Sequence, residues 1–258
     1  MIPLADTHCH LLAGLDDGPR TMDEAVQMCR IAYDEGTRVI AATAHINDQW
    51  PEVTPERIRA ATRKLAARLE DINLPLTIYP CAEVTISPDM ADRLERGELL
   101  SVSDYGVYLL MELPAGVFLN LCDLIQQLQE SGIRPILAHP ERQARLLHDP
   151  GLIEELIELG CLVQMTSNSI TRPSSRKDTQ MIKQWVQRGI VHLVGSDGHS
   201  PRSRSPRMAE AHRRISQWAG ATAADHICGT NGYAVLEGLS FHVPKPEPAK
   251  KSWFSFSP

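Results

Sequence analysis

Several features that would place the chain in a common class are missing from its 258 residues. No apolar run approaches the roughly 20 residues that a membrane-spanning helix needs. The N-terminus lacks a basic start followed by a long apolar segment, so we expect neither membrane insertion nor export. The formal net charge of −6 argues against a nucleic-acid-binding protein, whose surface is usually basic. We therefore expect a cytoplasmic protein.

The six cysteines form no chemical motif. None lies in a C-x-x-C pair, which argues against a disulfide framework and against a cysteine-ligated zinc site. No arginine stands six residues after any of them, as the phosphate-binding loop of a thiol phosphatase would require. A G-x-x-x-x-G-K-[ST] nucleotide loop is absent as well. Most of the cysteines are therefore expected to be buried apolar side chains.

Short apolar segments alternate along the chain with longer segments of helical periodicity. A capping box at Thr21 and Glu24 and a glycine at Gly36 predict the ends of the first helix. A helix, a glycine and then a buried strand recur in this order, which favours βα units and a parallel sheet. The predicted helices cover residues 22–36, 55–72, 117–132, 152–160 and 179–189. The predicted strands cover residues 3–10, 38–45, 76–84, 106–113, 134–140, 161–169 and 191–199.

Seven predicted strands indicate one α/β domain over residues 1–242, a distorted TIM-like (β/α)₇ barrel. An open doubly wound sheet is the alternative. Residues 243–258 are rich in Pro, Lys and Ser and contain three aromatic residues. We expect them to form a flexible C-terminal tail, and docking of its aromatic residues on a partner or a sister subunit stays open.

Polar side chains interrupt the predicted strands at their C-terminal ends. A parallel strand that is buried on both faces should be apolar throughout. Because these ends form one face of an α/β barrel, we expect the polar side chains to meet there. They are His8, His10, His45, Glu83, Glu112, His139, Asp197 and His199.

The ensemble of these side chains predicts a metal site. A single histidine or glutamate at a strand end is more often hydrogen-bonded or solvated than a ligand. Carboxylates held together, however, are costly unless they are protonated or bound to cations. Imidazole and carboxylate without thiolate suit manganese, iron or zinc, and this many ligands can hold more than one ion. Asp16 and Asp17 follow the first strand, and one of them could be a further ligand while the other turns the loop.

Arginines near the strand ends indicate a substrate class. Arg142 stands three residues after His139, and the segment 200–207, S-P-R-S-R-S-P-R, follows the last strand. A guanidinium beside metal ions suits a phosphate ester, because its planar fork pairs with two phosphate oxygens. Most of the neighbouring arginines are expected to be solvated, namely Arg145, Arg202 and Arg207. No role is assigned to His148, His192, His212, His226 and His242.

The chain resembles the PHP superfamily (polymerase and histidinol phosphatase), and within it the bacterial capsule and exopolysaccharide tyrosine phosphatases of the CpsB/YwqE type. The resemblance runs from Asp6 to Gly238 and implies the PHP type of barrel and activity on phosphotyrosine in the tails of bacterial tyrosine kinases. It rests on D-T-H-C-H (6–10), L-D-D-G-P (15–19), A-T-A-H (42–45), A-E-V (82–84), M-E-L (111–113), A-H-P-E-R (138–142), S-D-G-H (196–199) and P-R-M-A-E-A (206–211).

The resemblance also implies three divalent metal ions, usually manganese, and a set of residues around them. The implied ligands are His8, His10, Glu83 and Asp197 for the first ion, Glu83, Glu112 and His139 for the second, and Asp17, His45 and His199 for the third. Arg142 and Arg204 would bind the phosphate, with Arg202 a weaker alternative to Arg204. A metal-activated hydroxide would attack phosphorus in line, and a metal or His199 would assist departure of the phenolate.

Other functions remain open at this point. The main alternative is a small-molecule phosphomonoesterase of the same superfamily, such as a histidinol phosphatase, although the D-D-G-P loop and the chain length favour the tyrosine enzyme. The negative charge disfavours a metal-dependent nuclease, and the absence of a strand-end lysine disfavours an amidohydrolase. A non-catalytic module that binds kinase tails through the basic loop is a further alternative.

Overall fold

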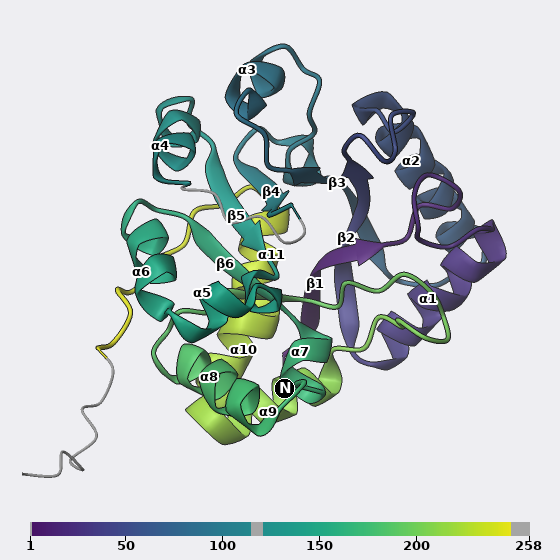
Figure 1. Cartoon of the computed structure of the whole chain (residues 1–258). Helices are drawn as coiled ribbons and strands as arrows, with labels where there is room; N and C mark the ends of the chain where they lie inside the picture. The colour runs from purple at the N-terminus through teal and green to yellow at the C-terminus, as the bar shows by residue number, and fades with distance from the viewer. Residues whose placement is uncertain (1, 115–120, 249–258) are drawn as a thin grey trace, which may run out of the picture.

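The structure is a computed structural model that describes residues 2–114 and 121–248. Seven parallel strands follow one another in sequence order, β1-β2-β3-β4-β5-β6-β7, and curve around a common axis with helices outside (Figure 1). Each strand pairs with the next. The strands are β1 (Leu4–His10), β2 (Thr37–Ile46), β3 (Thr77–Thr85), β4 (Tyr108–Glu112), β5 (Arg134–Ala138), β6 (Leu162–Thr166) and β7 (Leu193–Gly195).

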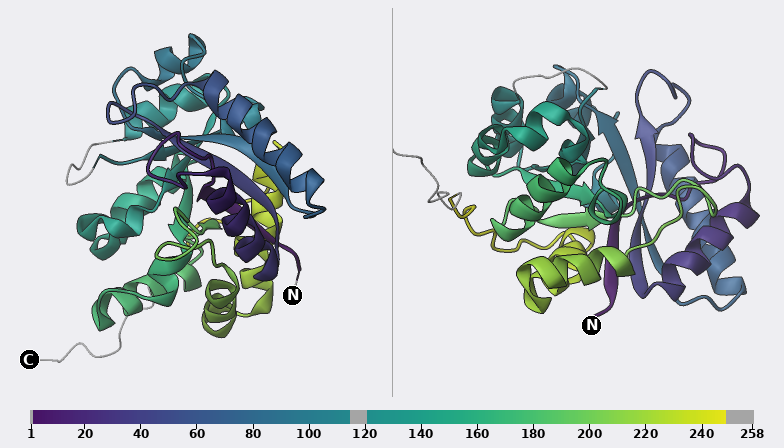
Figure 2. Two further views of the ribbon diagram at one scale, coloured as in Figure 1. Left: turned by 90° about the vertical axis from the view of Figure 1, so that its right-hand side faces the viewer. Right: turned by 60° about the horizontal axis from the view of Figure 1, so that its bottom comes forward.

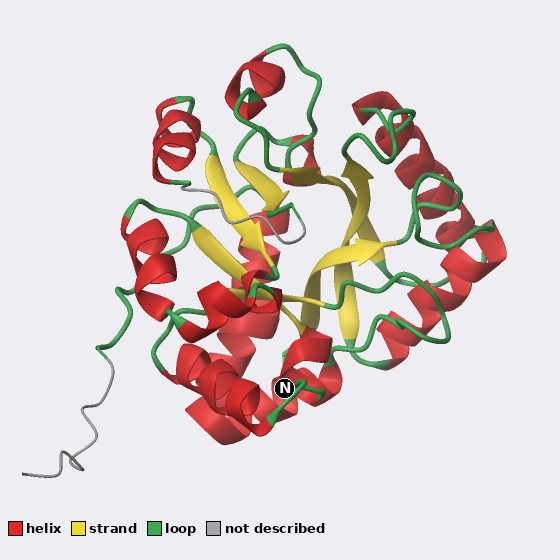
Figure 3. Cartoon of the chain, viewed as in Figure 1, coloured by secondary structure: helices red, strands yellow, loops and turns green. Residues whose placement is uncertain are grey.

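The first and last strands meet without forming a full ladder. Cys9 and Gly198 form a parallel bridge. The backbone N–H of His10 donates to the Gly198 carbonyl at 2.9 Å, and that of Asp197 donates to the His8 carbonyl at 2.7 Å. The sheet is therefore a nearly closed barrel, which confirms the predicted TIM-like α/β fold and not the open doubly wound sheet. Figure 3 shows the strands surrounded by helices.

Five helices confirm predicted ones. They are α1 (Met22–Asp34), α2 (Pro55–Asp71), α4 (Cys122–Glu130), α6 (Pro150–Glu158) and α8 (Arg176–Gln187). The Thr21 side chain accepts a hydrogen bond from the Glu24 N–H, as the capping box predicts. The start of the predicted helix 117–132 lies outside the described residues. Helical segments that were not predicted are α3 (Met90–Glu95), η1 (Val102–Asp104), η2 (Pro140–Arg142), α5 (Ala144–His148), α7 (Ser167–Thr171), α9 (Ala209–Ala219), α10 (Ala221–Asp225), η3 (His226–Thr230) and α11 (Asn231–Leu236).

The last two strands end earlier than predicted. The sixth was expected over 161–169, but Thr166 caps α7, and its hydroxyl accepts from the Ser169 N–H at 3.3 Å. The Ser169 N–H is thus bonded to the capping side chain and not to a neighbouring strand, and the chain begins a helix here. The seventh was expected over 191–199 but ends at Gly195, because the Ser196 N–H donates to the side-chain carboxylate of Asp6 at 2.8 Å instead of to a backbone carbonyl of a neighbouring strand.

Apolar side chains fill one end of the barrel and leave the other end to polar ones. Ala5, Leu110 and Ile136 belong to a buried cluster inside the barrel, together with Leu236 of α11. A Cβ atom at Gly232 would lie 2.7 Å from that of Ala5, so glycine allows α11 to pack closely against β1. A second, larger cluster lies between the strands and the outer helices. Figure 2 shows the arrangement of these strands and helices from two further sides.

The segment predicted as a tail begins on the barrel. Val243 packs against the interior cluster. The Glu247 N–H donates to the Arg188 carbonyl at 2.8 Å, and Arg188 Nε donates to the Glu247 carbonyl at 2.6 Å. The flexibility predicted for the rest of the tail concerns residues 249–258, which lie outside the described residues. None of the helices within the described residues is long and apolar enough to cross a membrane.

Candidate metal centre

The nine predicted ligands lie together at the C-terminal ends of the strands, a region that we call the mouth of the barrel. Four groups of side chains there offer nitrogen or oxygen atoms within 4.8 Å of one another. The groups are His8–His10–Asp197, His8–Glu83–His139, His45–Glu83–Glu112 and His10–Asp17–His45–His199. Every predicted ligand belongs to at least one group, so the folded chain brings all of them together.

Glu83 lies in the middle of this cluster and is only 1% exposed. Its Oε2 atom is 3.1 Å from Nε2 of both His8 and His10, and 3.3 Å from Nδ1 of His45. Its Oε1 atom is 2.7 Å from Nε2 of His139. One carboxylate therefore faces four imidazoles, with its two oxygens directed to different histidines. A carboxylate in this position could offer its two oxygens to different cations.

The hydrogen bonds of the Nδ1 atoms of His8 and His10 determine whether their Nε2 atoms, which face Glu83, carry a proton or a lone pair. His8 Nδ1 lies 2.9 Å from Oε1 of Gln164, whose Nε2 donates to a backbone carbonyl, so Oε1 is the acceptor. His10 Nδ1 lies 2.7 Å from Oδ2 of Asp16. A neutral imidazole that donates from Nδ1 carries a lone pair on Nε2. The two Nε2 atoms are 3.1 Å apart and both face Glu83 Oε2, so three lone pairs converge with no proton between them.

This convergence requires positive charge. Burial opposes protonation of His10, but hydrogen bonds and charges from Asp16 and Glu83 outweigh it and raise its pKa well above the usual value. Burial likewise opposes ionisation of Glu83, but the charge of His8 and hydrogen bonds from the other histidines hold its pKa well below the usual value. Nδ1 of His45 is buried, and no group in the described part of the chain forms a hydrogen bond with it. A divalent ion accepts several lone pairs at once, so these residues fit a metal centre.

A second convergence lies around Asp17. His199 Nδ1 lies 2.9 Å from the Asp197 carbonyl, which can only accept, so the Nε2 atom of the neutral ring carries the lone pair. That Nε2 atom is 3.3 Å from Oδ1 of Asp17, and Nε2 of His45 is 3.6 Å from the same oxygen. Lone pairs again meet a carboxylate, on the outer side of the cluster.

Asp16 and Asp17 have different surroundings, which settles what each can contact. The Asp16 side chain is fully covered, and it accepts from His10 Nδ1 and from the backbone N–H groups of Gly18 and His45. The Asp17 side chain is 47% exposed and faces the ligand set. Asp16 therefore orients a histidine, and Asp17 is the one of the pair that is open to a cation.

Asp197 faces the histidines with one oxygen and two arginines with the other. Its Oδ1 atom lies 3.6 Å from Nε2 of His8 and 3.5 Å from Nδ1 of His199. Its Oδ2 atom accepts from Arg142 and also from Arg204 at 2.6 Å. The side chains of these arginines are 42% and 45% exposed. The two predicted phosphate-binding arginines thus lie beside the cluster and remain open to a ligand.

Left-handed backbone turns direct two of the side chains into the mouth. His139 has a φ of 36° directly after β5, and Asp197 has a φ of 51° shortly after β7. Such conformations cost non-glycine residues about 1–3 kcal/mol and occur mostly at functional sites. Gly195 is needed for close packing here, because a Cβ atom at this position would lie 2.5 Å from that of His8.

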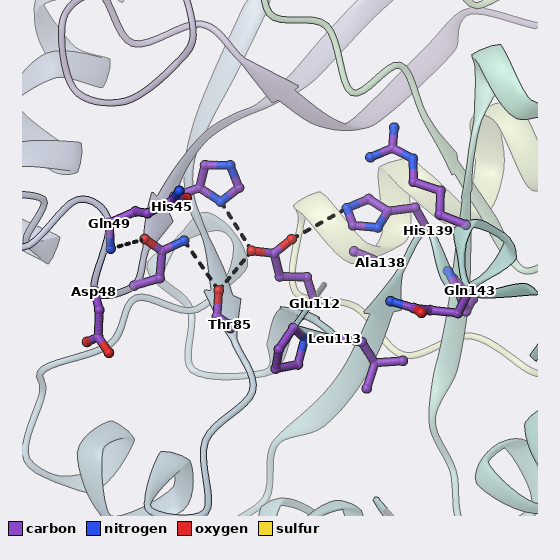
Figure 4. A pocket seen from close by; sticks show the side chains of 13 residues that line it. His45, Asp48, Gln49, Thr85, Glu112, Leu113, Ala138, His139 and Gln143 are labelled. Carbon is purple, nitrogen blue, oxygen red and sulfur yellow. Dashed lines mark hydrogen bonds and ion pairs between the residues drawn. The ribbon is translucent and has the colours of Figure 1, made fainter. Parts of the chain in front are cut away.

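An open pocket of about 800 Å³ gives access to one side of the cluster. Figure 4 shows Glu112 between His45 and His139, with contacts to both. The Thr85 hydroxyl donates to Oε1 of Glu112 at 2.8 Å and holds this carboxylate in place. Leu113 forms part of the apolar wall.

Sequence reasoning missed the residues that support the ligands. Gln164 orients His8 from β6, and the only signal for it was a glutamine in the middle of a buried strand. Glu141 accepts from both the N–H and the hydroxyl of Thr166 at 3.0 Å, which fixes the H-P-E-R turn against β6. Both contacts join segments that are far apart in sequence, so no local sequence pattern could predict them.

Comparison with known proteins places the sequence among tyrosine phosphatases of capsule synthesis. A family model described as capsular polysaccharide synthesis, CpsB/CapC, matches residues 4–237. The tyrosine-protein phosphatase YwqE of Bacillus subtilis (strain 168) is 29% identical over 249 residues, which cover 96% of this chain and 97% of that protein. The tyrosine-protein phosphatase CpsB of Streptococcus pneumoniae is 28% identical over 239 residues, which cover 90% and 98%.

Solved structures agree with this result. One match is a crystal structure from work on YwqE of Bacillus subtilis and CpsB of Streptococcus pneumoniae, which are described as unique metal-dependent tyrosine phosphatases. The TM-score is 0.88 at 29% identity, and the match covers 97% of this chain and 100% of the other. A β-aspartyl dipeptidase from Fervidobacterium islandicum AW-1, with a TM-score of 0.55 at 15% identity over 96% of this chain and 78% of that one, shares the fold alone. Because the family model covers nearly all of the barrel, the chain belongs to the CpsB/CapC family of capsular polysaccharide synthesis.

Proposed function

We propose that the chain is a metal-dependent protein-tyrosine phosphatase, a phosphoric monoester hydrolase. Its substrate would be phosphotyrosine in the tail of a bacterial tyrosine kinase that controls capsule or exopolysaccharide synthesis, in the cytoplasm. The main support is the convergence of the His8 and His10 lone pairs on Glu83, beside two half-exposed arginines and an open pocket. Cations and guanidinium groups together neutralise the charge of a phosphate monoester.

The ligand atoms would hold three divalent ions, with manganese expected and iron or zinc as alternatives. We assign His8, His10, Glu83 and Asp197 to one ion, Glu83, Glu112 and His139 to a second, and Asp17, His45 and His199 to a third. When bound, these ions supply positive charge at the phosphate and acidity that lets water act as a nucleophile near neutral pH. The hydrogen bonds that Nδ1 of His8 and of His10 donate to Gln164 and Asp16 keep these histidines in the tautomer that can bind a cation.

Arg142 and Arg204 would bind the phosphoryl oxygens, and Asp197 positions both. Guanidinium groups fixed in this way stabilise charge that builds up in the transition state. His199 would bind a metal ion through Nε2 near the leaving group. Its Nδ1 proton is already donated to a backbone carbonyl. A phenol with a pKa of about 10 leaves as the anion far more easily than an alcohol, so the reaction does not need His199 as a proton donor.

Chelation and reloading test the proposal. Purified protein is stripped with a chelator, reloaded with manganese, iron or zinc, and assayed on a phosphotyrosine peptide and on histidinol phosphate. We expect hydrolysis to stop on stripping, to return with manganese, and to be faster on the peptide. Undiminished hydrolysis by folded, metal-free protein would contradict the metal mechanism. Faster turnover of histidinol phosphate would favour the small-molecule phosphatase.

A further inference from the structure

Arg142 lies where three pockets of the described structure meet. It lines the pocket of Figure 4 and also two further hollows, of about 460 and 400 Å³. Arg172 lines both of these hollows, and Arg202, Arg204 and Arg207 line the larger one. We call these five residues the arginine groove. The groove joins the metal centre through Arg142 and Asp197, and it gathers five arginines although the chain carries a net charge of −6.

The carboxylates beside the arginine groove already have partners. Apart from Asp197, Glu210 lines the larger hollow and pairs with Arg213 at 2.5 Å. Asp178 lines the smaller hollow and lies 3.3 Å from Nε2 of His148. Glu141 of the smaller hollow is fixed by Thr166. Glu210 and Asp178 therefore contact residues other than the arginines of the groove.

Two of the arginines have no acidic partner in the described part of the chain. Arg172 and Arg202 are exposed, and no carboxylate among residues 2–114 and 121–248 forms an ion pair with either. Arg207, by contrast, bonds to Glu35 at 2.7 Å. The groove thus offers two solvated guanidinium groups next to the pair that contacts Asp197.

The opposite side of the mouth has a different character. The pocket of Figure 4 is lined by Asn47, Asp48, Gln49 and Leu113, and Arg142 is its one arginine among the described residues. A ligand that crosses the mouth therefore meets positive charge on one side and neutral, apolar or acidic groups on the other.

We propose that the arginine groove binds acidic residues that flank the phosphotyrosine on one side of the substrate polypeptide. This inference rests on the proposed function, because it takes the phosphotyrosine to lie at the metal centre. An extended polypeptide advances about 3.3 Å per residue, so the residues next to the phosphotyrosine pass over the groove. A small monoester has no part to place there. Exposed arginine–carboxylate pairs each give a modest gain in binding that salt screens.

Three phosphotyrosine peptides test the proposal with manganese-loaded enzyme. One has neutral flanks, one has two glutamates before the phosphotyrosine, and one has two glutamates after it. We expect one glutamate peptide, but not the other, to gain about five-fold in kcat/KM over the neutral peptide at low salt. The gain should shrink at high ionic strength. Equal rates on the two glutamate peptides would overturn the proposal.

Charge reversal assigns the effect to the groove. Arg172→Glu should abolish the gain and turn it into a preference for a lysine-flanked peptide, whereas hydrolysis of 4-nitrophenyl phosphate should stay at the wild-type rate. Arg63→Glu, an exposed arginine on α2, is the matched control and should keep the wild-type preference. An unchanged preference in Arg172→Glu would contradict the proposal. Failure of the wild type to hydrolyse 4-nitrophenyl phosphate would instead contradict the phosphatase function itself.

Discussion

Histidines at the two ends of the barrel have pKa values that are shifted in opposite directions. At the mouth, Asp16 and Glu83 overcome burial and raise the pKa of His10 well above its usual value. At the other end, His192 precedes β7 and is 4% exposed, and its Nδ1 atom accepts the Val163 N–H at 2.9 Å. Burial, with a small contribution from the charge of Arg134, lowers the pKa of His192 to about 3. The surroundings of each ring, and not the residue type, decide the direction in which its pKa shifts.

The two ends therefore serve different purposes. At the mouth, carboxylates and lone pairs lie closer together than a stable core would allow unless cations are present. At the opposite end, apolar side chains and the neutral His192 contribute to the stability of the fold. Substitutions at the mouth should thus reduce activity with little loss of folding, and those at the base should do the reverse.

The largest effect is expected for Glu83→Gln. An amide keeps the size of the side chain but removes the charge that faces His8, His10, His45 and His139. We expect kcat to fall by about 10³-fold or more, because the site would lose the carboxylate that we propose as a shared metal ligand. Steady-state kinetics on a phosphotyrosine peptide and elemental analysis of the purified variant measure the two losses.

His192→Asn is the matched control at the other end of the barrel. It should keep the wild-type metal content and kcat near neutral pH, because His192 lies away from the mouth. The comparison would break if Glu83→Gln retained full activity and metal, or if the His192 variant lost as much activity as the Glu83 variant.

Arg142→Ala should have the next largest effect. Loss of a guanidinium at a developing negative charge typically costs about 10²-fold in rate. We expect such a drop in kcat/KM on 4-nitrophenyl phosphate with the metal content unchanged. Arg63→Ala, on the outer surface of α2, should leave the rate as it is. A normal rate in Arg142→Ala would remove this arginine from the phosphate site and leave Arg204 as the candidate.

A smaller loss is expected from Gln164→Leu, which removes the acceptor for His8 Nδ1. Without this contact the His8 ring is free to adopt the other tautomer and to rotate. Loss of such a supporting contact lowers metal affinity by about 10- to 100-fold. Manganese titration of the stripped variant, followed by recovery of activity, gives the apparent affinity. An affinity equal to that of the wild type would show that packing alone orients His8.

The sequence was sufficient to predict the barrel and the residues at its mouth. Parallel strands share one direction, so a polar residue such as Glu83 or His139 at the end of an apolar strand had to lie near the others. The same periodicity located five helices. Between residues 200 and 240 no helix was predicted, although Ala211 and Ile215 lie on a buried face of α9.

Other features depend on contacts between distant segments. The sequence could not say that Asp16 turns inward to His10 while Asp17 stays half exposed, because both stand in the same loop. The arginine groove combines Arg142 with Arg172 and with the loop after β7, and only the fold brings them together. The end of β6 was mispredicted because Thr166 can either continue a strand or cap a helix.

The smallest expected effect is a loss of folding stability in acid that depends on His192, at the end of the barrel opposite the mouth. The pKa of His192 is about 3 in the folded protein, against about 6.5 when unfolded, so the unfolded state binds more protons below pH 6.5. The contribution of the neutral ring to stability is therefore complete above pH 6.5 and is lost as the pH falls towards 3. His192→Asn keeps an acceptor for the Val163 N–H but cannot take up a proton. Urea unfolding at pH 7 and pH 5.5 should show the wild type losing about 1 kcal/mol more than the variant. Parallel losses in the two proteins would mean that His192 is already charged in the folded state, and the contrast with His10 would disappear.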